Sequence, residues 1–194
     1  MTGEWYRMTR AAQMVALAAL TVVTLAGCGG AEPESGSIAD EVPTTSSAPP
    51  TPPALRPAAK RHDREGAAEF ARYWFALLGY SFRTGDAAPL RQASDRDCAV
   101  CNQALTIIRD GYTGGASLEG GRYTVREARA LETSGSVALT VVVTYDRTPR
   151  SRTTPLGGST KELDGAGYAD CDLRLRWTGS AWKVNGVDAT EPVV

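Results

Sequence analysis

The chain has 194 residues, enough for one ordinary domain with extensions, and 42% of its residues are hydrophobic while 22% are charged. This composition is typical of a globular protein and excludes collagen-like chains and chains that are disordered throughout. The formal net charge of −1 gives no general attraction to nucleic acid, and four cysteines with one histidine are too few for a dense disulfide scaffold or a histidine-rich metal centre. We therefore expect no nucleic-acid partner, no metal and no cofactor.

The first 27 residues have the pattern of an export signal. Arg7 and Arg10 precede an apolar run over residues 14–26, which is shorter than the roughly 20 residues that span a bilayer. The run ends in Leu25-Ala26-Gly27-Cys28, which resembles a bacterial lipobox. The resemblance implies cleavage before Cys28 and lipidation of its sulfur, which would hold the protein on the outer face of the cytoplasmic membrane. A plain secretory signal, or an uncleaved short helix that happens to contain a cysteine, is the alternative.

Residues 28–62 are predicted to form a disordered linker. The stretch from residue 29 to residue 62 is rich in Gly, Pro, Ser, Thr and Ala, and it holds seven of the eleven prolines of the chain. Because it offers few large apolar side chains, it cannot bury a core, and we expect a solvated spacer with polyproline character.

Residues 63–194 are predicted to form one folded module that begins with helices. Residues 64–82 contain no proline and place apolar side chains at three- and four-residue spacing, which predicts an amphipathic helix. Asp86 is positioned to cap a short helix over residues 87–93. Residues 94–97 have the pattern of a capping box and predict a third helix over residues 95–112.

The second half of the module changes to the two-residue period of strands. Strands are expected over residues 122–131, 137–144, 168–177 and 181–185. Residues 147–167 form a long polar connection that can hide a short strand near residues 159–163. Helices followed by antiparallel strands indicate an α+β fold.

This layout resembles a known family. The segments FARYWFALLGYSFRTGDAAPLRQASDRDCAVCNQAL (residues 70–105) and RWTGSAWKV (residues 176–184) resemble an actinobacterial lipoprotein family, domain-of-unknown-function family 6318. The resemblance covers roughly residues 63–188. The order of elements also resembles the nuclear-transport-factor-2-like fold, which implies a cone of curved antiparallel sheet with the N-terminal helices packed on it. The family implies no activity, and many unrelated functions share the fold.

Three cysteines remain once Cys28 is assigned to lipid. Cys98 and Cys101 lie three positions apart at the start of the third predicted helix, and outside the cell we expect them to form a disulfide that fixes the helix start. A thioredoxin-type redox pair is the alternative, although no strand precedes Cys98. A metal site that joins both to Cys171 is a third interpretation. Cys171 alternates with apolar residues and is expected to be a buried thiol.

Five aromatic residues are candidates to line a pocket inside such a cone, and the alternative is that they fill its core. They are Tyr73, Trp74, Tyr80, Tyr112 and Tyr123. Asp170 and Asp172 share a strand face with Arg174 and Arg176, which favours cross-strand ion pairs over acid–base chemistry.

No catalytic residue is predicted, since the sequence shows no phosphate loop, zinc signature or Ser-His-Asp pattern. We expect a lipid-anchored, outward-facing binding or interaction module that is not an enzyme. Its expected partners are the membrane, through the anchor, and a cell-wall or envelope component, for which Arg147, Arg150 and Arg152 are candidate contacts. The alternatives are a thiol-disulfide oxidoreductase that uses Cys98 and Cys101, and a cone-fold protein that binds a small ligand.

Overall fold

The computed structural model describes residues 50–131, 138–155 and 160–194. All of them belong to one compact unit, Ser46–Val194. The predicted signal peptide, Cys28 and the linker as far as residue 49 lie outside the described residues. Among the described residues, no helix combines the length and the apolar character needed to cross a membrane.

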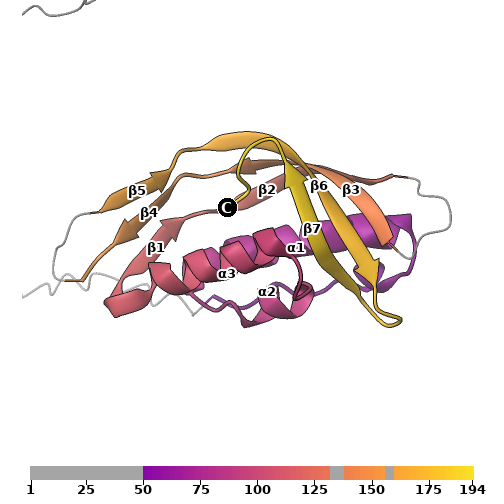
Figure 1. Cartoon of the computed structure of the whole chain (residues 1–194), viewed down its shortest axis with the longest axis horizontal. Coiled ribbons are helices and arrows are strands. Elements are labelled where there is room, and N and C mark those ends of the chain that lie inside the picture. The colour runs from indigo at the N-terminus through magenta and orange to yellow at the C-terminus, as the bar shows by residue number, and fades with distance from the viewer. Residues whose placement is uncertain (1–49, 132–137, 156–159) are drawn as a thin grey trace, which may run out of the picture. The chain divides into compact units, whose positions relative to one another are not determined.

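Helices form the first half of this unit (Figure 1). A short 3-10 helix, η1 (Pro57–Lys60), leads into the long helix α1 (Arg64–Thr84), which is followed by α2 (Ala88–Ala93), α3 (Ala99–Gly111) and the 3-10 turn η2 (Thr113–Gly115). The Asp63 carboxylate accepts a hydrogen bond from the Gly66 amide at 2.6 Å and caps the start of α1. Gly85, at a φ of 76°, ends that helix in the left-handed conformation that glycine adopts without strain.

Strands form two antiparallel sheets. The four-stranded sheet has the order β2 (Tyr123–Ala130), β3 (Ala138–Arg147), β6 (Gly167–Trp177) and β7 (Trp182–Ala189). The three-stranded sheet has the order β1 (Ser117–Gly120), β4 (Arg150–Thr153) and β5 (Lys161–Asp164). Leu139, Val141 and Val143 on β3 face Leu175, Leu173 and Cys171 on β6, so the predicted apolar faces of both strands lie on the same side of the sheet.

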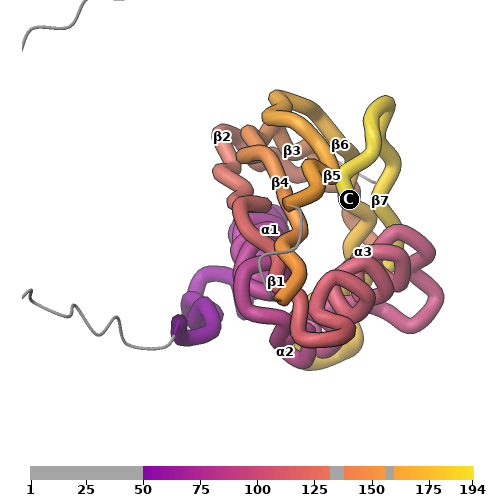
Figure 2. The backbone as a smooth tube through the Cα atoms, turned by 90° about the vertical axis from the view of Figure 1, so that its left-hand side faces the viewer, coloured from indigo at the N-terminus to yellow at the C-terminus, as the bar shows by residue number. Residues whose placement is uncertain are grey.

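The sheets curve over α1 and α3, as the view turned by 90° shows (Figure 2). This arrangement is the α+β fold predicted from the sequence, with the N-terminal helices packed on curved antiparallel sheets that form the expected cone. Large side chains are buried inside the cone. The largest fully buried ones are Trp74, Trp182, Tyr145, Phe75, Phe82, Leu77 and Leu78.

The folded unit includes residues that the sequence analysis assigned to the linker. Ala59 is 1% exposed and belongs to the hydrophobic core, and the Arg61 carbonyl accepts a hydrogen bond from the Trp182 indole at 2.8 Å. At Gly66, a Cβ atom would lie only 2.1 Å from the Arg61 carbonyl oxygen, so glycine lets this segment lie close to α1. The predicted start of the module at residue 63 is therefore too late, because proline-rich composition concealed a packed segment.

The predicted capping box is wrong. The Ser94 hydroxyl accepts a hydrogen bond from the Trp74 indole at 2.9 Å and donates one to the Leu90 carbonyl at 2.8 Å. Helix α3 begins at Ala99 instead, with Cys98 as its N-cap. A buried indole that needs an acceptor explains why the Ser94 side chain serves tertiary packing rather than capping.

The long polar connection holds two strands, not one. The strand expected near residues 159–163 corresponds to β5, whereas β4 and its partner β1 were not predicted. Each of the three is only four residues long, too short for a clear alternating pattern in the sequence.

Candidate functional site

The disulfide between Cys98 and Cys101 closes the first turn of α3. Both residues are 0% exposed, and the Cys98 sulfur accepts a hydrogen bond from the Cys101 amide at 3.3 Å. Thiol-disulfide exchange requires a thiolate to reach one of the sulfur atoms. A pair enclosed in this way is suited to fixing the helix start and unsuited to catalysing exchange.

Cys171 is a free thiol in the core, and the predicted burial is confirmed. It is 3% exposed, and burial, with a smaller effect from the neighbouring Asp172 and Asp170 carboxylates, raises its pKa to about 12. The thiol is therefore neutral at physiological pH and serves neither as a nucleophile nor as a ready metal ligand. Within the described ranges, no three His, Cys, Asp or Glu residues gather in a way that could hold a metal ion.

The five aromatic candidates do not line one common pocket. Trp74 is 0% exposed and bonded to Ser94. The Tyr80 hydroxyl donates to the Asp86 carboxylate at 3.1 Å, and the Tyr112 hydroxyl donates to a main-chain carbonyl of α1 at 2.9 Å. Core packing and hydrogen bonds to nearby groups thus explain the positions of Trp74, Tyr80 and Tyr112.

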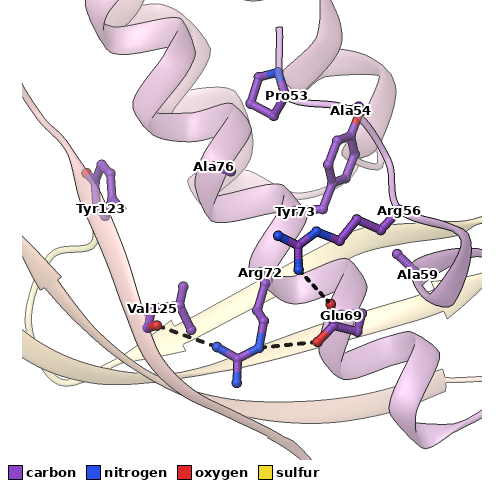
Figure 3. Close-up of a pocket in the computed structure, with 10 residues that line it drawn as sticks. All are labelled: Pro53, Ala54, Arg56, Ala59, Glu69, Arg72, Tyr73, Ala76, Tyr123 and Val125. Atoms are coloured by element: carbon purple, nitrogen blue, oxygen red, sulfur yellow. Dashed lines mark hydrogen bonds and ion pairs between the residues drawn. The ribbon is translucent and has the colours of Figure 1, made fainter.

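Tyr73 and Tyr123 do line a pocket, a groove outside the cone. The groove lies between the segment before α1, one side of α1 and the edge strand β2, and its volume is about 540 Å³ (Figure 3). Its walls are mostly apolar, and its charged residues are two arginines and one glutamate. The lining residues are Pro53, Ala54, Arg56, Ala59, Glu69, Arg72, Tyr73, Ala76, Tyr123 and Val125.

Positive charge exceeds negative charge along this groove. The Arg72 Nε lies 3.5 Å from the Glu69 carboxylate, and its Nη1 donates to the Val125 carbonyl at 3.5 Å. Arg56 Nη1 lies 4.0 Å from the same Glu69 carboxylate (Figure 3). All three contacts are long, so each guanidinium keeps hydrogen-bonding capacity for a ligand.

Tyr73 is a neutral group of the groove at physiological pH. Burial raises the pKa of its phenol above the ordinary value of 10.0. The hydroxyl can therefore donate a hydrogen bond, but it is not a base. The groove as a whole offers donors, apolar contacts and a surplus of positive charge, which suits binding better than proton transfer.

Sequence reasoning missed four of the ten lining residues because Pro53, Ala54, Arg56 and Ala59 were assigned to the linker. It also missed the packing of His62, whose ring stacks on Trp177 with centroids 4.5 Å apart. The available signal for the packed segment was Ala59, a small apolar residue about one turn before the Asp63 cap of α1. A single alanine is only a weak indication of packing.

The arginines of β6 form ion pairs with residues of other elements. Arg174 binds Asp188 at 3.1 Å, and Arg176 binds Asp95, whose carboxyl pKa is lowered chiefly by that hydrogen bond. The Asp170 carboxylate accepts a hydrogen bond from the Thr144 hydroxyl at 2.6 Å. The Arg174–Asp188 pair joins β6 to β7 and is a cross-strand ion pair of the kind predicted, whereas Asp170 bonds across the strands to a hydroxyl instead of an arginine.

Two of the arginines proposed as contacts for a cell-wall or envelope component are bonded within the folded unit. Arg150 is 4% exposed; its guanidinium binds Asp164 and lies 4.3 Å above the Phe82 ring. Arg152 donates to the Gly111 carbonyl at 3.3 Å. These side chains connect the small sheet to the helices.

Comparison with known families matches residues 41–188 to a family of unknown function, DUF6318. The chain belongs to this family. The matched range begins before the predicted module, in agreement with the packed segment that precedes α1. No curated protein matches the chain.

Several solved structures are similar in fold. The intermembrane-space region of the chloroplast protein ARC6 has a TM-score of 0.48 and 13% identity, covering 66% of this chain and 97% of its own. The beta subunit of a putative aromatic-ring-hydroxylating dioxygenase from Novosphingobium aromaticivorans has a TM-score of 0.42 and 11% identity, over 64% of this chain and 88% of its own. A putative scytalone dehydratase from the same organism has a TM-score of 0.38 and 11% identity, over 66% and 85%. Structural similarity at this level does not indicate that this chain shares an activity with any of these proteins.

Proposed function

We propose that this DUF6318 protein is a lipoprotein of the outer face of the cytoplasmic membrane, and that its folded unit is a binding module rather than an enzyme. The groove beside α1 is the proposed binding site, and its surplus of positive charge over an apolar floor is the observation that carries the proposal. The lipobox-like motif that ends in Cys28 supports the anchor. The enclosed Cys98–Cys101 disulfide supports an oxidising compartment outside the cytoplasm.

The groove favours an acidic ligand with an apolar body. Arg56 and Arg72 share the single Glu69 carboxylate, so one guanidinium charge is left for an anionic group. Tyr73, Ala76 and Val125 offer apolar contact beside it. A volume of about 540 Å³ lies within the range of small-ligand sites, about 300–1,000 Å³.

The anchor is tested by metabolic labelling with an alkyne analogue of palmitate. We expect the parent chain to be labelled and to sediment with membranes, and Cys28→Ser to lose both properties. Cys171→Ala is the matched control, because it removes a cysteine from the core and should keep the label. Globomycin should cause the unprocessed precursor to accumulate, and a precursor whose processing does not respond would contradict the lipoprotein proposal.

Binding is tested with the dye 8-anilinonaphthalene-1-sulfonate, which combines an anionic group with an apolar body. We expect Arg72→Gln to weaken dye binding about tenfold, the equivalent of one charge-assisted hydrogen bond. Arg109→Gln is the control, since Arg109 is an exposed arginine on α3 that pairs with its neighbour Asp110. Equal loss in both variants would refute the groove as the site.

A further inference from the structure

Four residues of α1 lie in a row along the side of the helix that borders the groove. Arg72, Ala76, Gly79 and Arg83 are spaced four, three and four positions apart, which places them on one face of a helix. Arg72 and Ala76 line the groove, and Arg83 lies three turns after Arg72, roughly 16 Å along the helix axis. The row therefore has a guanidinium at each end and two small residues between them.

Arg83 lies where α1 and the start of β2 touch. A Cβ atom on Gly79 would be 3.2 Å from Arg83 Nη1. The same position is 3.3 Å from the Gly121 carbonyl oxygen and 3.4 Å from the Tyr123 amide nitrogen. Glycine at this position thus lets the helix approach the strand closely. Because Tyr123 also lines the groove, the Arg83 guanidinium lies beside one end of it.

No carboxylate balances the positive charge at this end of the groove. The Arg83 pKa is lowered, first by partial burial and then by the charge of Arg122, and no carboxylate among the described residues raises it. The two guanidinium groups are therefore close enough to repel each other. Arg147 and Arg150, two further arginines near Tyr123, share the single carboxylate of Asp164.

The opposite end of the groove also has a surplus of positive charge. Arg56 and Arg72 share the Glu69 carboxylate through contacts of 4.0 and 3.5 Å. Figure 3 shows these three side chains together, with Ala76 and Tyr123 further along α1. The remaining lining residues carry no charge, so an apolar stretch separates two positive ends.

We propose that the groove takes an elongated ligand with an anionic group at each end and an apolar body between them. This inference rests on the proposed function and specifies the class of ligand. One anionic group binds between Arg56 and Arg72. The other binds Arg83 and Arg122 and relieves their mutual repulsion, since carboxylate and phosphate oxygens match the hydrogen-bonding geometry of a guanidinium. A ligand with only one anionic group leaves one of the two ends without a counter-charge.

Calorimetry on the full chain compares two acids of equal length, dodecanedioate with a carboxylate at each end and dodecanoate with one. We expect the parent to bind dodecanedioate about tenfold more tightly, the equivalent of one charge-assisted hydrogen bond. Arg83→Gln should bind both acids with the affinity that the parent has for dodecanoate. Arg109→Gln removes the same charge from an exposed position on α3, and this control should keep the preference of the parent.

Three results would overturn the two-ended ligand. They are equal affinity of the parent for both acids, a folded Arg83→Gln variant that still prefers the diacid, and pentanedioate, too short to reach both ends, binding as tightly as dodecanedioate. The dye experiment separates this test from that of the proposed function. A groove that binds the dye but not dodecanedioate contradicts only the two-ended ligand, whereas a groove that does not bind the dye contradicts the proposed function.

Discussion

The buried thiol of Cys171 predicts a specific loss of stability at alkaline pH. Its pKa is raised in the folded protein from an ordinary value of 9.0 to about 12, chiefly by burial. Between these two values the unfolded chain loses the thiol proton while the folded chain keeps it, so stability falls as pH rises. From pH 8 to pH 10.5 the expected loss from this one group is about 2 kcal/mol.

Urea unfolding of the parent and of Cys171→Ala at the two pH values measures this loss. Most other titrating groups contribute equally to both proteins, and any cavity left by alanine affects both pH values equally. The exception is the Tyr145 phenol, whose pKa is raised chiefly by burial and next by the charge of Cys171. The difference between the two pH-dependent losses therefore measures the thiol together with its coupling to Tyr145. If the parent and Cys171→Ala lose the same free energy of unfolding, the thiol is not protected from ionisation and the argument from burial is wrong.

Three further substitutions test the packing. Ser94→Ala should cost about 1–3 kcal/mol because the Trp74 indole loses its acceptor, and adding Trp74→Phe should cost less than the sum of the two single changes, as a double-mutant cycle measures. Cys98→Ala/Cys101→Ala should lower the free energy of unfolding by about 2 kcal/mol, because the disulfide closes only a short loop; a loss above about 5 kcal/mol in urea would contradict this. Asp164→Asn should cost about 3–5 kcal/mol by leaving the buried Arg150 guanidinium and the partly buried Arg147 guanidinium without their carboxylate, which thermal unfolding detects.

The sequence predicted the parts of the fold whose periodicity is long and regular. The helix over residues 64–82 and the alternating strand over residues 168–177 agree with α1 and β6 within a few positions. Their patterns are clear because each element buries one continuous face, and that face also fixes which residues lie in the core.

The parts that could not be predicted depend on contacts between distant segments. Nothing near Ser94 in the chain indicates that the Trp74 indole needs its hydroxyl, and nothing near Ala59 indicates that α1 will cover it. The groove is of the same kind, because it is assembled from the segment before α1, one side of α1 and the strand β2, which meet only in the folded unit. Composition alone therefore placed the domain boundary too late.

The enclosure of the disulfide constrains the order of events during maturation. Because Cys98 and Cys101 are both 0% exposed, an oxidant has no route to them once α3 has settled against the rest of the molecule. The bond must therefore be made while this stretch of chain is still open, and afterwards reductants meet the same barrier. A protein that matures without an oxidant would reach its final shape with two trapped thiols, and later exposure to air would not repair them until the helix opens.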